Sequence, residues 1–279
     1  MPRADFVLCD VFTDRPFAGN QLAVFPDARD IPEDDLQRLA REFNFSEVTY
    51  LYPAVGDGDA RLRIFTPETE LPFAGHPTLG SAAVVAHLRQ TAAVVLETGV
   101  GVVPVQLEAT GDRRARGWMH QPVPTATSFA DADALLEVLG VDKSLLPVEV
   151  YDNGVRHLFV ALPDESAVAA LRVDVARLTH VGGGINCFAG AGTRWKTRCF
   201  FDGLPAGEDP ATGSAAGPLL YHLVRHGLVE RGAQIEISQG AELGRPSALY
   251  ARTDGGDDPL DGIHVGGDVV IVGDGTLTW

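Results

Sequence analysis

Two stretches of the chain carry nearly the same eight letters, HPTLGSAA at residues 76–83 and DPATGSAA at residues 209–216. Five of the eight positions agree, and the copies lie 209 − 76 = 133 residues apart. Each copy places a proline second, where a missing backbone N–H is tolerated at the start of a helix, and continues into small and then larger apolar residues. The repeat predicts two buried central helices, near residues 76–90 and 210–227.

Convergence on a generic small-residue helix start would also produce the octets. Similar strand and helix patterns around both copies favour duplication instead, with strand-like runs before each octet such as QLAVFP and RLRIFTP, then RHLFVALP and TRCFFDG. We therefore predict an α+β fold of two similar halves.

The Pro-rich segment Gln121–Ser128 is the predicted boundary between the halves. This places residues 1–120 with 264–279 in the N-terminal half and residues 121–263 in the C-terminal half. The last stretch, IHVGGDVVIVGDGTLTW, reads as a β-hairpin. Its letters leave open which half it joins, and we assign it to the first.

Composition and charge narrow the functional classes. A formal net charge of −16 and no local basic patch predict that nucleic acid is not a partner. No window approaches the ~18 apolar residues of a membrane span, and the N-terminus lacks the pattern of a signal peptide. The three cysteines are odd in number and form no C-x-x-C, which predicts reduced thiols in a cytoplasmic protein.

The octets also suggest a type of ligand. We expect His76 and Asp209 to occupy the N-cap position, or its neighbour, of the two central helices. A helix start offers unpaired N–H groups and a partial positive charge, which suit a carboxylate or an enolate. The expected ligand is a small carboxylate, and the letters leave open whether it is a ring, a chain or an amino acid.

Five segments in order resemble one family: DVFTDRPFAGNQLAVF, NFSEVTY, RIFTPETELPFAGHPTLGSAA, GEDPATGSAAGPL and ISQGAELGRPS. Together they are similar to the PhzF-like isomerases of phenazine biosynthesis. The resemblance implies the diaminopimelate epimerase-like fold, in which two pseudo-twofold-related halves each curl a barrel-like sheet around a central helix, with the active site between them. It also implies a homodimeric enzyme without cofactor or metal. The best-known member isomerises trans-2,3-dihydro-3-hydroxyanthranilate by moving a proton between carbons.

Carried over to matching positions, the resemblance makes Glu47 of NFSEVTY the general acid/base, faced by His76 and Asp209 as the other catalytic residues. The positions that would line the substrate pocket are Ser46, Gly75, Gly213 and Ser214. The chemistry suits these residue types, because one carboxylate can serve as base and then as acid when its pKa lies near ambient pH. Apolar neighbours of Glu47, among them Phe45, are expected to raise its pKa.

Two other patterns in the sequence do not indicate a metal site or a serine nucleophile. His222 and His226 have the i, i+4 spacing of metal ligands, but no glutamate follows His222 and we predict no metal. Ser214 lies in GSAAG, which is not a G-x-S-x-G nucleophile elbow, so a hydrogen-bonding role is favoured.

Two alternatives to the isomerase stay open. One is an amino-acid-type epimerase or racemase on the same fold, although neither 72–80 nor 205–214 holds the cysteine that a thiol pair would need. The other is a non-catalytic small-molecule-binding protein. Glu47, His76 and Asp209 argue against that alternative.

Overall fold

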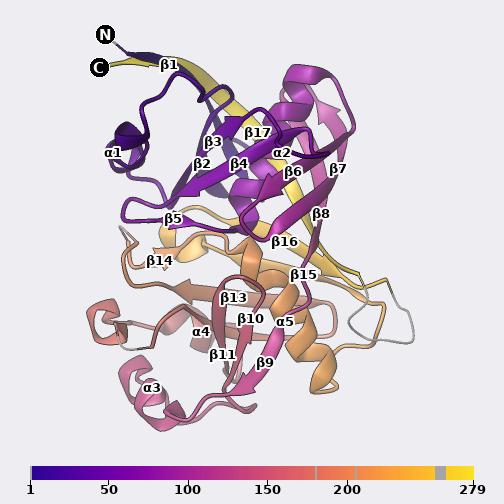
Figure 1. Ribbon diagram of the computed structural model, residues 1–279. Coiled ribbons are helices and arrows are strands. Elements are labelled where there is room, and N and C mark those ends of the chain that lie inside the picture. The colour runs from indigo at the N-terminus through magenta and orange to yellow at the C-terminus, as the bar shows by residue number, and fades with distance from the viewer. Residues whose placement is uncertain (1, 180, 205, 255–261) are drawn as a thin grey trace. The chain divides into compact units, whose positions relative to one another are not determined.

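The computed structural model describes residues 2–179, 181–204, 206–254 and 262–279. The chain divides into two compact units. Unit 1 consists of residues 1–120 and 266–279, and unit 2 of residues 121–265. The first and last strands, β1 and β17, run side by side within unit 1 (Figure 1).

Unit 1 is a closed barrel of eight strands. They are β1 (Arg3–Val11), β2 (Asn20–Phe25), β3 (Glu47–Tyr52), β4 (Ala60–Phe65), β6 (Ala93–Thr98), β7 (Gly101–Gly111), β8 (Arg114–Gln121) and β17 (Ile263–Thr278). Pairing runs in that order and returns from β17 to β1, so no barrel strand keeps an unpaired edge. The pairs β2–β3 and β4–β6 are parallel, and the two-residue strand β5 (Glu70–Leu71) lies beside β4.

Helix α2 (Gly75–Arg89) fills this barrel (Figure 1). All residues from Gly75 to Ala86 are buried, as expected for a helix that meets strands on every side. Gly80 shows how close the approach is, because a Cβ there would lie 2.6 Å from a methyl group of Leu22. Helix α1 (Glu33–Phe43) packs outside the barrel over a cluster that includes Phe25 and Tyr50.

Unit 2 is built from a second set of strands around helix α5 (Gly213–Arg225). The strands are β9 (Thr125–Ser128), β10 (Glu149–Asp152), β11 (Arg156–Ala161), β12 (Gly184–Ala191), β13 (Arg194–Phe200), β14 (Glu208–Asp209), β15 (Gln234–Gln239) and β16 (Ser247–Arg252). The other helices are α3 (Ala132–Leu139), α4 (Glu165–Ala170) and two short 3₁₀ turns, Val175–Leu178 and Ala241–Leu243.

The two units pair their strands in the same sequence. From β1 to β7 the pairs are antiparallel, parallel, antiparallel, parallel and antiparallel, with β5 as a short branch on β4. From β10 to β16 the pairs repeat this series, with β14 as the branch on β13. The predicted α+β fold of two similar halves, each with a sheet around a central helix, is confirmed.

The octets themselves do not mark equivalent positions. Helix α2 begins at Gly75, five residues after Glu70 opens β5, and α5 begins at Gly213, five residues after Glu208 opens β14. The structural offset is therefore 213 − 75 = 138 residues, not 133. The equivalent of His76 is Ser214, the second residue of its helix.

The expectation that His76 and Asp209 stand at or beside a helix cap was wrong. The N-cap of α2 is Ala74, and His76 is the second residue of the helix. Asp209 ends strand β14, and the N-cap of α5 is Thr212, which makes no side-chain capping hydrogen bond. The matching residues of the two octets have different structural roles. Gly80 allows close packing in the middle of α2, whereas Gly213 is the first residue of α5. The two octets are thus alike in composition but not equivalent in position, although the two units share the same order of strand pairing.

The predicted terminal hairpin was also wrong, since residues 263–278 form one long strand, β17. Two of its glycines lie against aromatic rings rather than in a turn. A Cβ on Gly275 would lie 2.7 Å from the Phe6 ring, and one on Gly266 would lie 2.5 Å from the Trp118 indole. A tight hairpin does occur in unit 1, where β6 and β7 pair on either side of residues 99 and 100.

Candidate active site

Glu47 is placed by the junction between α1 and β3. Helix α1 ends at Asn44, whose left-handed conformation (φ 51°) lets its N–H bond the carbonyl of Ala40 and turns the chain outward. Three residues later Glu47 opens β3, opposite Leu22 of the parallel strand β2. Its side chain is only 12% exposed. Ser46, the preceding residue, is half-buried at the same strand end.

His76 meets Glu47 from the first turn of α2. Its Nδ1 lies 3.6 Å from Oε2 of Glu47 and 3.1 Å from Nδ2 of Asn20, the first residue of β2. Nε2 of His76 is buried and makes no hydrogen bond. Gly75, which opens α2, is buried beside it. Three elements of unit 1 thus bring a carboxylate, an imidazole and an amide together.

His76 is uncharged at neutral pH. Burial lowers the pKa of its imidazole to about 3, against a smaller opposing effect of the Gln21 backbone. The contact with Glu47 therefore involves a neutral ring and is not an ion pair. Such a ring can still give or take one hydrogen bond at the nitrogen that lacks a partner.

Asp209 belongs to a separate polar network in unit 2. Its carboxylate accepts a hydrogen bond from the Thr212 hydroxyl at 2.7 Å, and its backbone carbonyl accepts one from Nε2 of Gln239 at 2.7 Å. Gln239 also donates to the Thr212 hydroxyl at 2.9 Å. All three residues are buried. The network holds the short segment between β14 and α5.

A buried ion pair anchors β14. The Arg198 guanidinium binds Glu208 through two hydrogen bonds of 2.8 and 2.7 Å, with side chains only 8% and 6% exposed. Unit 1 repeats the pair as Arg63 and Glu70, also doubly bonded, where the glutamate is 42% exposed. In both units the arginine stands two residues before the phenylalanine that pairs with the glutamate.

Ser214 is fixed at both its hydroxyl and its carbonyl. Pro218 stands four residues later inside α5 and has no N–H to donate to that carbonyl. Nδ2 of Asn153 supplies the missing donor at 2.9 Å. The Ser214 hydroxyl lies 3.0 Å from Nε2 of His157. Gly213, one residue earlier, accepts a hydrogen bond at its carbonyl from Gln121 at 2.8 Å.

The residues expected from the sequence thus fall into two groups. Ser46, Glu47, Gly75 and His76 gather in unit 1, and Asp209, Gly213 and Ser214 gather in unit 2. Sequence reasoning missed the polar partners of these groups, namely Asn20, Asn153, His157, Thr212 and Gln239. A search for R-x-F followed by E-x-P-x-x-G, present at residues 63–75 and 198–213, would have aligned the units correctly.

Glu149 on β10 lies beside His222 of α5 and His226, the residue that follows this helix. Oε2 of Glu149 lies 2.8 Å from Nε2 of His226 and 3.3 Å from Nδ1 of His222, a grouping that could hold a metal ion. The same oxygen already accepts a hydrogen bond from the Tyr151 hydroxyl at 2.8 Å. Its partner oxygen lies 3.3 Å from the Arg225 guanidinium, so the carboxylate is already satisfied.

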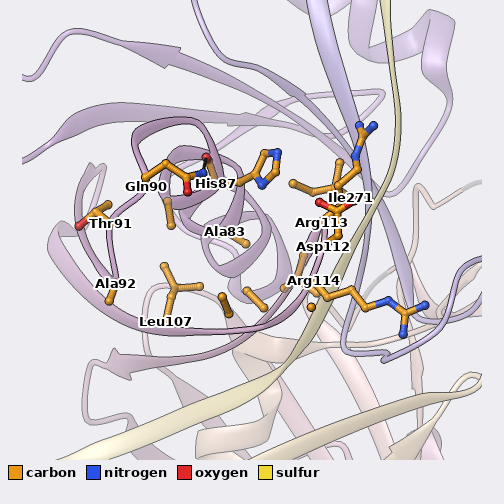
Figure 2. A pocket seen from close by; sticks show the side chains of 15 residues that line it. Ala83, His87, Gln90, Thr91, Ala92, Leu107, Asp112, Arg113, Arg114 and Ile271 are labelled. Atoms are coloured by element: carbon orange, nitrogen blue, oxygen red, sulfur yellow. Dashed lines mark hydrogen bonds between the residues drawn. The ribbon is translucent and has the colours of Figure 1, made fainter.

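A separate pocket of about 380 Å³ lies in unit 1 at the C-terminal end of α2. Figure 2 shows His87 and Gln90 on its helix side and Leu107 on its barrel side. His87 follows His76 by 87 − 76 = 11 residues, roughly 16 Å along the axis at 1.5 Å per residue. This pocket is therefore at the opposite end of the central helix from Glu47 and His76.

The three cysteines are buried and form no disulfide. Burial raises the pKa of all three thiols, that of Cys187 to about 12. The first residues of the two central helices are glycine followed by histidine or serine. No thiol stands where a two-thiol epimerase would carry its acid and base.

Comparisons with known proteins agree on one family. The family model described as "Phenazine biosynthesis-like protein" matches residues 9–275. A curated relative from Pseudomonas chlororaphis, named trans-2,3-dihydro-3-hydroxyanthranilate isomerase, is 45% identical over 98% of each chain.

Solved structures show the same fold. A Bacillus anthracis protein of the PhzF family superposes with a TM-score of 0.85 over all of both chains at 22% identity. A hydroxyproline epimerase from Agrobacterium vitis superposes with a TM-score of 0.64 over 99% of this chain and 92% of its own, at 13% identity. These likenesses confirm the epimerase-like fold expected from the sequence.

Proposed function

Because the chain belongs to the PhzC-PhzF family of phenazine biosynthesis-like proteins, we propose that this isomerase moves a proton between two carbons of a small carboxylate, with Glu47 as the proton carrier. The proposed substrate is trans-2,3-dihydro-3-hydroxyanthranilate, the compound named for relatives at 44–45% identity. Glu47 takes a proton from one carbon and returns it to another, so the reaction needs no other reactant.

The observation that carries the proposal is the unbonded Nε2 of His76. A buried polar atom without a partner costs free energy, and such atoms persist where a ligand supplies the missing bond. This one belongs to a ring whose other nitrogen lies 3.6 Å from Glu47. His76 is proposed to hydrogen-bond the substrate while Glu47 transfers the proton.

Unit 2 is proposed to contribute substrate-binding groups. The N–H groups at the start of α5, at Gly213 and Ser214, suit an anionic oxygen. Asp209 is proposed as the third catalytic residue, and its hydrogen bond with Thr212 fixes the direction of its carboxylate. Ser46 and Gly75 are proposed to complete the binding surface of unit 1.

The proposal extends to the state of the protein in the cell. A cytoplasmic location is supported by the three buried, unbridged thiols. Among the helices of the described residues, none has the length and apolarity needed to cross a membrane. A homodimer is proposed on the family resemblance, and light scattering of the purified chain tests it.

Reaction in heavy water tests the function. We expect the purified chain to convert trans-2,3-dihydro-3-hydroxyanthranilate and to place deuterium, in part, at a carbon that carried no hydrogen in the substrate. Label returned only to the original carbon would indicate an epimerase. Absence of both turnover and label, with binding retained, would indicate a binding protein and would overturn the proposal.

A further inference from the structure

Beside Ser214, unit 2 holds a buried chain of three side chains. The Ser214 hydroxyl lies 3.0 Å from Nε2 of His157, and Nδ1 of His157 lies 3.3 Å from Nδ2 of Asn186. The three residues are between 0% and 5% exposed. At first sight the order serine, histidine, asparagine matches that of a nucleophile, its base and the group that orients the base.

The hydrogen bonds of Asn186 contradict that first interpretation. Its Nδ2 lies 3.2 Å from the carbonyl oxygens of Leu158 and Gly184, so this atom is the amide nitrogen and donates. A flipped amide would set its oxygen against two carbonyls. The two N–H bonds of this amide lie among three acceptors, and its nitrogen accepts no hydrogen bond. A proton on Nδ1 of His157 would point at a group that cannot receive it, so the proton of the neutral ring resides on Nε2.

This tautomer determines what Ser214 can do. Nε2–H of His157 donates to the Ser214 oxygen, so the ring takes no proton from the hydroxyl and does not act as its base. Burial lowers the pKa of His157 to about 3, so the ring keeps its single proton near neutral pH. The Ser214 oxygen accepts the hydrogen bond from His157, so the proton of the Ser214 hydroxyl points away from His157 and can be donated to another group.

We propose that His157 is a positioning residue that makes the Ser214 hydroxyl a dedicated hydrogen-bond donor to an anionic oxygen of the substrate. This inference rests on the proposed function, in which the start of α5 binds the carboxylate or the enolate oxygen. Ser214 neither attacks the substrate nor moves its proton. His157 touches no reacting atom and acts only through the serine.

The surroundings of His157 hold the ring in one orientation. A Cβ on Gly184 would lie 2.9 Å from Nδ1 of His157 and 2.5 Å from the Phe201 ring, so only glycine leaves room there. Phe201 meets the imidazole edge to face at 5.9 Å. The Ser214 carbonyl is held separately by Asn153, so the backbone stays in place when the hydroxyl loses its partner.

Nitrogen NMR of the wild-type protein with labelled histidine tests the tautomer without any assay of turnover. We expect the His157 Nε2 signal to show a bonded proton and Nδ1 to show none, from pH 5 to pH 8. A proton on Nδ1, or titration near pH 6.5, would overturn the inference. Because no substrate is needed, this result is independent of the proposed function.

Three variants test the role of His157 in catalysis. His157→Leu removes the donor, and kcat/KM is expected to fall about tenfold to a hundredfold, the range for losing a hydrogen bond to a charged group. His157→Gln restores an N–H near the same place and is expected to recover most of that loss. In a Ser214→Ala background, His157→Leu is expected to have no further effect.

The double variant separates positioning from general structural damage. If His157 only supports the fold, His157→Leu lowers activity equally with or without the Ser214 hydroxyl, and that result overturns the inference. Circular dichroism and thermal melting identify variants that fail to fold, in which case His157→Gln and the NMR measurement decide. Wild-type protein that does not turn over the proposed substrate refutes the proposed function, whereas the NMR result still decides the tautomer.

Discussion

His76 and Ser214 hold the same place in their units, each being the second residue of a central helix that begins five residues after a two-residue strand opens. Duplication has given the two positions different chemistry. His76 itself carries an imidazole, whereas Ser214 carries a hydroxyl that lies 3.0 Å from the imidazole of His157. The equivalent helix starts thus carry different hydrogen-bonding groups.

Glu47→Gln tests the proton carrier. The change removes the carboxylate and little volume, so we expect turnover to fall by at least about a hundredfold, the lower range for general acid/base catalysis, while melting and substrate binding are retained. Steady-state kinetics and calorimetric binding measure this. Glu42→Gln, an exposed change in α1, is the control. Activity within tenfold of wild type would remove Glu47 from its assigned role.

Asp209→Ala and Thr212→Val separate catalysis from local support. Both remove the 2.7 Å hydrogen bond between them, but only Asp209→Ala deletes the carboxylate. We expect similar losses of stability, about 1 kcal/mol each, and a much larger loss of kcat/KM in Asp209→Ala. Equal effects on kcat/KM would leave Asp209 a structural residue.

The paired glutamates of the two units test how burial affects an ion pair. Glu208→Gln leaves the buried Arg198 without its counter-ion and should cost about 3–5 kcal/mol of unfolding free energy. Glu70→Gln should cost about 1 kcal/mol or less, because Glu70 is 42% exposed and Arg63 also binds Glu33. Urea denaturation measures both, and similar costs would contradict the comparison.

Acid should destabilise the protein through its buried histidines. Burial lowers the pKa of His76 and His157 to about 3, and lowers that of His222 to about 4 with a further contribution from His226. Unfolded histidines titrate near 6.5, so between these values the unfolded chain binds more protons. Stability is then fully present above pH 6.5 and is lost as pH falls toward 3–4.

Each buried histidine adds at most about 1.4 kcal/mol per pH unit to that loss. Urea denaturation at pH 7, 6 and 5 measures the slope. His157→Gln should remove one histidine's share of it. An equal slope in wild type and His157→Gln would contradict the buried-histidine account.

Chelation tests the expectation that no metal takes part. Arg225 and the hydroxyl of Tyr151 already satisfy Glu149, so we expect dialysis against a strong chelator to leave kcat/KM and the melting temperature unchanged. Lower activity that zinc restores would overturn this expectation. If His222→Gln abolished the restoration, the Glu149 cluster would be the metal site.

The sequence predicted two buried central helices because such helices are apolar on every face and small where they approach a strand. The barrel-like sheet around each helix was implied by the family resemblance. The octets gave the wrong alignment of the two halves, because stretches rich in small residues can occur at different positions in two related units. The better markers are the R-x-F and E-x-P patterns that occur in both units. The segments between the two patterns differ in length, being residues 66–69 in unit 1 and 201–207 in unit 2. Unequal loops hide such a repeat from a comparison at one fixed offset.

Polar partners were harder to predict than the carboxylate and the helix starts. His157 reaches Ser214 across 57 residues, and Glu149 reaches His226 across 77. Nothing in the local pattern of either histidine indicates such a distant contact. The strand β17 was missed for a different reason, because its glycines look like turn residues until the rings packed against them are known.

The return of β17 to the first unit also constrains synthesis. During synthesis, β1 and β8 each keep one unpaired edge while residues 121–265 are made, because β17, which pairs with both, follows them in the sequence. The second unit is thus translated in full before the first can close. During that interval the two edges can pair with strands of other chains.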